Sequence, residues 1–196
     1  MPQTTIAVVY HSGFGHTKAV AEHILKGASS VAGASAVLIS VDELPAPNAD
    51  RSMGGRWNEL ATADAIIMGC PTYMGDVSWK FKQFMEYSSS IWFQQGWKDK
   101  IAAGFTNSGS PSGDKLQTLS TIAIFAAQHS MVWVGNGIMS KGQAPTDLNR
   151  LGSFLGVMAQ SDNGPADVTP PSGDRQTAEL FGARVAQSAL RWNKGK

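Results

Sequence analysis

Residues 5–17 read TIAVVYHSGFGHT, and this stretch decides the fold. Its first six residues, Thr5–Tyr10, form a short apolar, β-branched run, which is typical of a strand buried on both faces of a parallel sheet. A loop with two glycines follows. From Thr17 onward the apolar spacing becomes that of a helix, which Gly33 ends. The order strand, glycine loop and helix indicates the start of an α/β unit.

The same alternation continues along the chain. Further strands are predicted at Ala36–Val41, Ala65–Met68, Ile101–Thr106 and Met131–Val134, with helices at Ser78–Ser89, Lys115–Gln128 and Arg175–Leu190. Strands that alternate with helices predict right-handed crossovers and a parallel sheet covered on both faces. We therefore expect a single domain over residues 1–196, with a three-layer α/β fold and a five-stranded parallel sheet.

Two stretches do not fit simple connections. Residues 45–57 and 141–171 are rich in Pro and Gly, and both are predicted to be long loops. Loops of this length in a compact domain indicate binding or association. Beyond the second loop, Ser172 is predicted to cap the last helix through its hydroxyl.

Composition excludes several function classes. The chain has 16 Lys and Arg against 15 Asp and Glu, so no general attraction to nucleic acid or to acidic membranes is expected. Cys70 is the single cysteine, which excludes an intramolecular disulfide and a multi-cysteine metal site. No secretory signal or membrane-spanning run is visible. We expect a cytoplasmic protein with no membrane insertion and no metal.

The first loop is suited to a phosphate. Its glycines allow backbone N–H groups to turn inward, Ser12 and Thr17 add hydroxyls, and the helix start adds its dipole. A Walker loop is excluded because Lys18 follows Thr17, and the third glycine of a dinucleotide motif is absent. A mononucleotide phosphate fits better than either motif. The alternative is a strand-to-helix turn that binds no ligand.

At this point a family resemblance can be stated. Ser-x-x-Gly-His-Thr after the first strand resembles the flavodoxin superfamily, especially its WrbA-type NAD(P)H:quinone oxidoreductases. Residues 69–75 (GCPTYMG) resemble the G-x-P-T-x-x-G loop of that family, residues 105–109 (FTNSG) its F-x-S-T-G segment, and residues 129–132 (HSMV) its H-G-M-V. The resemblance implies a flavodoxin-like fold with strand order 2-1-3-4-5 and bound FMN.

The loops after the third and fourth strands are suited to a flavin ring. Pro71 stiffens its loop, Tyr73 and Met74 offer flat or polarizable surface, and Gly75 allows a close backbone approach. The alternative is a surface loop that only covers the next helix. The predicted FMN-binding residues are Ser12, Gly13, Phe14, Gly15, His16, Thr17, Pro71, Thr72, Tyr73, Met74, Gly75, Thr106, Asn107, Ser108, Gly109 and His129.

The resemblance also places Trp92 and His129 on the substrate side of the flavin, partly from a neighbouring subunit. An indole can stack on a nicotinamide or a quinone, but Trp92 is equally suited to an interface or a core. His129 near a helix end can contact flavin or only favour the helix dipole. No residue is assigned a certain catalytic role.

The resemblance implies an FMN-dependent oxidoreductase that passes electrons from NADH or NADPH to a quinone or similar acceptor. It also implies a homodimer or homotetramer. A flavodoxin-type single-electron carrier, an FMN reductase and a flavin-free regulatory module are the alternatives. Tyr73 stands where this branch often has an arginine near the nicotinamide, so recognition of a pyridine nucleotide stays open, as does the choice between NADH and NADPH.

Overall fold

The computed structural model describes residues 3–195 and has an α/β architecture. Its strands are β1 (Thr4–Tyr10), β2 (Ala34–Ser40), β3 (Ala65–Tyr73), β4 (Asp76–Val77), β5 (Ile101–Ser108), β6 (Val132–Trp133) and β7 (Val157–Gln160). Its helices are α1 (His16–Ser29), α2 (Trp57–Thr62), α3 (Trp79–Tyr87), α4 (Ser89–Phe93), α5 (Lys115–Gln128) and α6 (Ser172–Asn193), with a 3₁₀ turn at Val41–Glu43. The predicted alternation of strands and helices is confirmed.

The sheet runs β2-β1-β3-β5 with all four strands parallel, and a fifth position lies beyond β5. Two short strands share that position. β6 pairs with the start of β5 at Ile101–Ala102, and β7 pairs with its end at Phe105–Ser108. The prediction of five strands is therefore wrong in number, because the chain leaves the sheet after β6 and returns as β7. β7 lies inside residues 141–171, which we predicted to be a long loop.

A small hairpin extends β3 beyond the predicted strand. β4 pairs antiparallel with Thr72–Tyr73, and the turn between them uses Met74 at φ 48° and Gly75 at φ 84°. Two positive φ angles are typical of the tight turns that join hairpin strands. Pro71 to Tyr73 are thus strand residues rather than a free loop.

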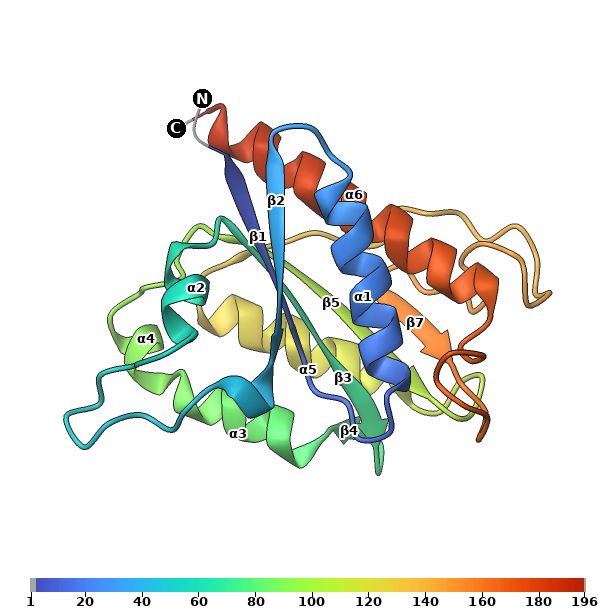
Figure 1. Cartoon of the computed structure of the whole chain (residues 1–196), viewed down its shortest axis with the longest axis horizontal. Coiled ribbons are helices and arrows are strands. Elements are labelled where there is room, and N and C mark those ends of the chain that lie inside the picture. Colours follow the sequence, from blue (N-terminus) through green and yellow to red (C-terminus); the bar gives the residue numbers. More distant parts are fainter. Residues whose placement is uncertain (1–2, 196) are drawn as a thin grey trace.

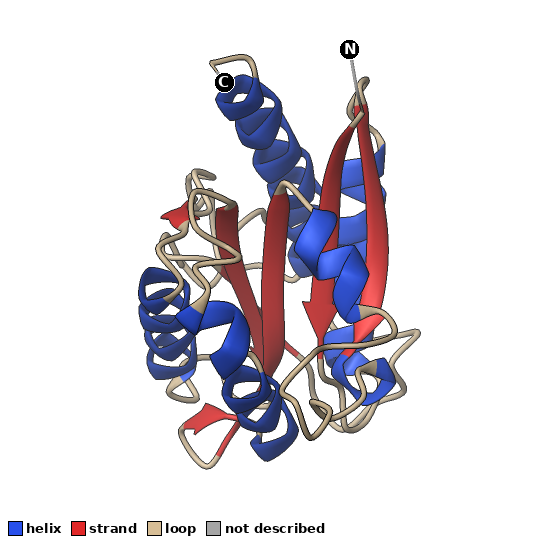
Figure 2. Cartoon of the chain, turned by 90° about the vertical axis from the view of Figure 1, so that its left-hand side faces the viewer, coloured by secondary structure: helices blue, strands red, loops and turns tan. Residues whose placement is uncertain are grey.

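Helices cover both faces of the sheet (Figure 2). On one face, α1 and α6 pack Val20 and Ile24 together with Phe181 and Val185. These two helices lie side by side in Figure 1, and an added Cβ at Gly27 would overlap the carbonyl of Glu179. Only glycine allows the two backbones to approach so closely.

The other face holds an aromatic core under α2, α3 and α5. Phe84 lies at its centre and contacts Trp57, Phe81, Trp97 and Phe125, with ring centroids between 5.3 and 6.2 Å apart. Fully burying such a side chain stabilises the fold by about 1.5–3 kcal/mol. The two buried clusters hold the sheet rigid between them.

The last helix begins differently from our prediction. α6 starts at Ser172 itself, Pro171 is the residue before it, and no side chain within residues 3–195 caps the helix. The predicted hydroxyl cap is wrong because Pro171 already sets an extended backbone before the first turn. At the far end of α6, the Asn193 side chain donates to the hydroxyl of Thr4 in β1.

The carboxyl ends of β1, β3 and β7 point toward the lower edge in Figure 1. Within residues 3–195, no helix has the length and apolar character needed to cross a membrane. The same residues contain no cluster of three or more His, Cys, Asp or Glu placed to hold a metal ion. The carboxyl edge is where open parallel sheets bind ligands.

Candidate functional site

A cavity of about 490 Å³ lies at the carboxyl edge of the sheet. Its size is within the range of small-molecule and cofactor sites. Residues from four segments line it: Ser12, Gly13, Phe14, His16 and Thr17; Pro71, Thr72 and Tyr73; Asn107, Ser108 and Gly109; and Ser161, Asp162, Asn163, Gly164, Pro165 and Ala166. The three loops singled out in the sequence therefore meet in one place.

The first loop is shaped for an anion. Gly15 precedes α1 with φ 92°, and its N–H donates to the Ser12 hydroxyl over 3.0 Å. No side chain in the described part of the chain caps α1, so the N–H groups of its first turn stay available beside the buried Thr17. Among the described residues, neither Lys nor Arg lines this cavity. An anion here would be held by backbone N–H groups, hydroxyls and the helix dipole.

Gly13 and Tyr73 bring the first two loops into close approach. A Cβ added at Gly13 would lie 2.5 Å from the Tyr73 hydroxyl oxygen. Only glycine fits here without movement of the tyrosine. Burial raises the pKa of Tyr73, with a smaller contribution from Cys70, so the phenol stays protonated at neutral pH.

Thr106 lies beneath the cavity instead of lining it. Its side chain is fully buried, and its hydroxyl donates to the carbonyl of Cys70 over 2.7 Å. Thr72 lies 2.9 Å from that hydroxyl and 2.8 Å from the hydroxyl of Thr118 in α5. We predicted that Thr106 contacts the ligand. In this structure its hydroxyl instead joins the ends of β3 and β5 to α5.

Cys70 is buried, and burial raises the pKa of its thiol to about 12. The thiol is therefore protonated at physiological pH. It packs within the aromatic face of the core and does not line the cavity.

The fourth wall was missed in the sequence. Residues 161–166 follow β7 and line the cavity. The His16 side chain reaches this wall, with Nε2 2.8 Å from the carbonyl oxygen of Gly164. Because a carbonyl only accepts, Nε2 carries the proton. The only sequence signal for this wall was the length and the Pro and Gly content of residues 141–171.

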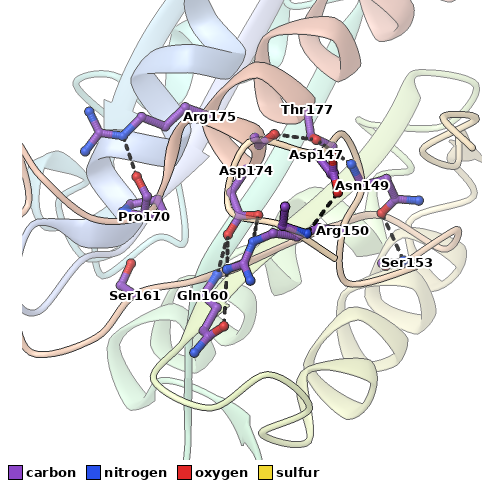
Figure 3. Close-up of polar contacts among 12 residues, drawn as sticks. Asp147, Asn149, Arg150, Ser153, Gln160, Ser161, Pro170, Asp174, Arg175 and Thr177 are labelled. Atoms are coloured by element: carbon purple, nitrogen blue, oxygen red, sulfur yellow. Dashed lines mark hydrogen bonds and ion pairs between the residues drawn. The ribbon is translucent and has the colours of Figure 1, made fainter. Parts of the chain in front are cut away.

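A polar network behind this wall fixes it in place (Figure 3). Arg150 forms a two-bond ion pair with Asp174, with distances of 2.7 and 3.0 Å, and both side chains are buried or nearly so. Asp174 also accepts from the backbone N–H of Gln160. Arg175 donates to the carbonyls of Pro170 and Ala166, so both arginines hold the loop through charge-assisted bonds.

Besides Thr106, five predicted site residues do not line the cavity within one chain, and one of them is Gly15 in the first loop. Met74, which is exposed, and Gly75, which is half-buried, form the tip of the β3–β4 hairpin. Trp92 and His129 line a separate hollow. α5 begins beside the cavity and ends just before His129, and its 14 residues span about 21 Å. A contact between His129 and a flavin in this cavity would therefore have to involve another subunit.

His129 is a buried core residue in this chain. Its ring packs 4.4 Å from Trp97 and 4.8 Å from Phe125, and Nε2 lies 2.9 Å from the Ser88 hydroxyl. Nδ1 has no hydrogen-bond partner among the residues that the structure describes. Burial lowers the pKa of His129 to about 4, so the ring is neutral at physiological pH.

Comparison with known proteins agrees with this geometry. Residues 6–146 match the family described as NADPH-dependent FMN reductase. The chain is 40% identical to flavodoxin FldP of Pseudomonas aeruginosa over 92% of this chain and 94% of that protein. It is 31% identical to an NAD(P)H dehydrogenase (quinone) of Geobacter sulfurreducens, over 96% of this chain and 98% of that protein.

A solved structure of a similar protein has the same fold. The crystal structure of a WrbA-like flavodoxin from Agrobacterium tumefaciens superposes with a TM-score of 0.73 at 39% identity, covering 96% of this chain and 99% of that one. The expected flavodoxin-like fold is confirmed in its parallel α/β sheet. The chain belongs to the NADPH-dependent FMN reductase family.

Proposed function

We propose that this protein is an FMN-dependent oxidoreductase that transfers electrons from NADH or NADPH to a quinone or a similar small acceptor. The observation that carries the proposal is the convergence of the uncapped α1 terminus with the ends of β3 and β5 in one cavity. Relatives named NAD(P)H dehydrogenase (quinone), which align over nearly the whole chain, support the acceptor and the donor.

The residues present fit FMN. The first loop offers the phosphate free N–H groups and the hydroxyls of Ser12 and Thr17. At position 13 only glycine fits, because the Tyr73 hydroxyl leaves no room for a Cβ. Asn107, Ser108 and Gly109 offer polar groups two strands away, about 10 Å along the sheet edge. An anion site and a polar wall at this separation suit a ligand with a phosphate at one end and a polar ring at the other.

The chemistry that FMN supplies when bound is the exchange of electrons between a reduced nicotinamide and the acceptor. The protein contributes binding and orientation. We assign the phosphate to Ser12–Thr17 and the ring to the walls formed by Pro71–Tyr73, Asn107–Gly109 and residues 161–166. Phe14 is 80% exposed at the cavity and Tyr73 is 39% exposed, so flat apolar surface is available for an aromatic substrate.

The phosphate assignment is tested by comparing FMN with riboflavin, which lacks the phosphate. We expect apoprotein to bind FMN at least a hundredfold more tightly than riboflavin, and Thr17→Val to reduce this preference. Exposed Thr62→Val at the end of α2 is the matched control, and should leave both affinities unchanged. Equal affinity for the two flavins would contradict the assignment.

A second candidate is a flavodoxin-type electron carrier, which the similarity to flavodoxin FldP favours. Carriers often dock through a strongly charged surface, whereas the charges of this chain nearly balance. Purified holoprotein that oxidises neither NADH nor NADPH with any quinone would favour the carrier. FMN lost on dilution, with release of reduced flavin, would favour a flavin reductase.

We also propose a homodimer or homotetramer in the cytoplasm. Trp92 is 48% and Phe93 is 82% exposed beside the hollow that His129 lines, and such surface suits association. A single buried thiol suits a reducing compartment. Sedimentation of the holoprotein tests the assembly, and a monomer at all concentrations would contradict it.

A further inference from the structure

Lys115 is a fully buried lysine in the first turn of α5. Its ammonium donates to the Ser108 hydroxyl over 2.7 Å and to the carbonyl of Ser110 over 2.5 Å. Among residues 3–195, no carboxylate lies within ion-pair distance of it. Lysine is almost never fully buried without a paired charge, because desolvation of the ammonium is costly. This residue therefore calls for a functional explanation.

Two charged groups act on Lys115 from the neighbouring elements. Asp174 at the start of α6 raises its pKa, while Arg150 in the preceding loop lowers it. These two side chains neutralise each other in their ion pair (Figure 3). Burial is the largest effect and lowers the pKa of Lys115 to about 8. The ammonium is thus an uncompensated positive charge at neutral pH, and it loses its proton above about pH 8.

The loop that Lys115 holds forms part of the cavity wall. Ser108 and Gly109 line the cavity, and the Ser108 hydroxyl is the group to which Lys115 donates. The same loop folds back at Gly113, where an added Cβ would lie 2.5 Å from that hydroxyl. Gln160 and Ser161 donate to the carbonyls of Gly109 and Ser108 from the other side. The charge therefore lies one hydrogen bond away from a residue that lines the cavity.

The position of this charge along the cavity decides which end of a ligand it affects. β3 lies between β1 and β5, so the end of β5 is about 10 Å from the phosphate loop that follows β1. The ammonium therefore acts on the end that we assign to the ring. A positive charge beside a flavin ring stabilises negative charge on that ring, and two-electron reduction at neutral pH places negative charge there.

We propose that Lys115 is a positioning residue that sets a fixed positive charge behind the Ser108–Gly109 wall and thereby favours reduced over oxidised flavin. This inference rests on the proposed function, since it requires FMN in the cavity. It assigns Lys115 to the tuning of the flavin potential, and it distinguishes that role from simple support of the loop.

The test compares three variants of the FMN-loaded protein at pH 7.5. Lys115→Met removes the charge, Lys115→Arg keeps it, and Lys98→Met removes an exposed lysine outside the cavity. Dissociation constants for oxidised and for reduced FMN are measured anaerobically, together with the midpoint potential. For Lys115→Met we expect affinity for reduced FMN to fall about tenfold more than affinity for oxidised FMN. This lowers the two-electron potential by about 30 mV.

The other variants should stay close to the wild-type potential at pH 7.5. A merely structural role would weaken both flavin forms equally in Lys115→Met and leave the potential unchanged, which would overturn the inference. Absence of FMN binding by the wild-type protein would instead overturn the proposed function.

The pH dependence gives a second test that does not need Lys115→Met to fold. Arginine keeps its charge at all accessible pH values, whereas Lys115 becomes neutral above its pKa. The potentials of wild type and Lys115→Arg should therefore agree at pH 7 and separate above about pH 9, with the wild type lower. Identical potentials across this range would contradict the inference.

Discussion

The Nε2 atom of His16 lies 2.8 Å from the carbonyl oxygen of Gly164, and this bond joins the first wall of the cavity to the last. The two residues are 148 positions apart in the sequence. A side chain that we expected to serve only the ligand also holds a distant loop over it. The shape of the site therefore depends on a contact between segments that no local pattern relates.

Loss of this bond should loosen the 161–166 wall. We expect His16→Ala to weaken FMN binding about fivefold, since a hydrogen bond of this kind contributes about 1 kcal/mol. Amide hydrogen exchange in residues 161–166 should also become faster. His23→Ala, at a half-buried position of the same helix that does not line the cavity, is the control, and should change neither quantity. Unchanged exchange in His16→Ala would show that the wall is held by the arginine network alone.

The close approach of Gly13 to Tyr73 allows a rescue experiment. An alanine at position 13 would place its Cβ 2.5 Å from the tyrosine hydroxyl oxygen, whereas the next ring atom is 3.5 Å away. We therefore expect Gly13→Ala to weaken FMN binding at least tenfold, and Gly13→Ala combined with Tyr73→Phe to recover most of the loss.

Flavin fluorescence titration measures both effects. Tyr73→Phe alone is the control and should bind FMN nearly as well as the wild type. A double variant as weak as Gly13→Ala would place the cause elsewhere than in this contact.

The sequence predicted the fold correctly where the structure of a residue depends on its near neighbours in the chain. The apolar run of β1, the glycine loop after it and the spacing of Val20 and Ile24 depend only on near neighbours, so they indicated the α/β unit correctly. β7 was missed because Val157–Gln160 is a short strand bounded by a loop whose path is set by contacts far along the chain. Examples are the pairing with Phe105 and the ion pair of Arg150 with Asp174.

The candidate site, too, was predicted only in part from the sequence. Strand ends that point to one edge bring Ser12, Pro71 and Asn107 together, and strand order alone predicts that. Thr106 and Asn107 are adjacent, yet only Asn107 lines the cavity, because the hydroxyl of Thr106 bonds the buried carbonyl of Cys70 instead. His129 and Trp92 were placed by resemblance, and the length of α5 separates His129 from the cavity.

The buried ion pair of Arg150 and Asp174 should contribute strongly to stability. Asp174→Asn leaves the guanidinium without its charged partner, and we expect the free energy of unfolding to fall by about 3 kcal/mol. The exposed pair of Lys26 and Glu179 is a matched comparison, because Glu179→Gln should cost less than about 1 kcal/mol. Urea denaturation at pH 7 measures both, and equal losses would contradict the difference in burial.

His129 should make the fold sensitive to acid. Its pKa is about 4 in the folded protein and about 6.5 in the unfolded chain, so the unfolded state binds the extra proton first. Stability is therefore lost as pH falls from about 6.5 to about 4, by on the order of 3 kcal/mol.

Comparison of His129→Leu with the wild type isolates this effect. The variant removes the titrating group, so the loss of unfolding free energy between pH 7 and pH 4.5 should be smaller than in the wild type. His23→Leu, on the other face of the sheet, should keep the full loss. The same pH dependence in His129→Leu and wild type would show that other groups cause it.

The most direct measurement of the proposed function is anaerobic reduction of the FMN-loaded protein, followed by the flavin absorbance band in a stopped-flow instrument. We expect NADH or NADPH to bleach the band at a rate compatible with turnover, and one equivalent of a quinone to restore it fully. If dithionite bleaches the band but neither nicotinamide does, the protein is not an NAD(P)H:quinone oxidoreductase.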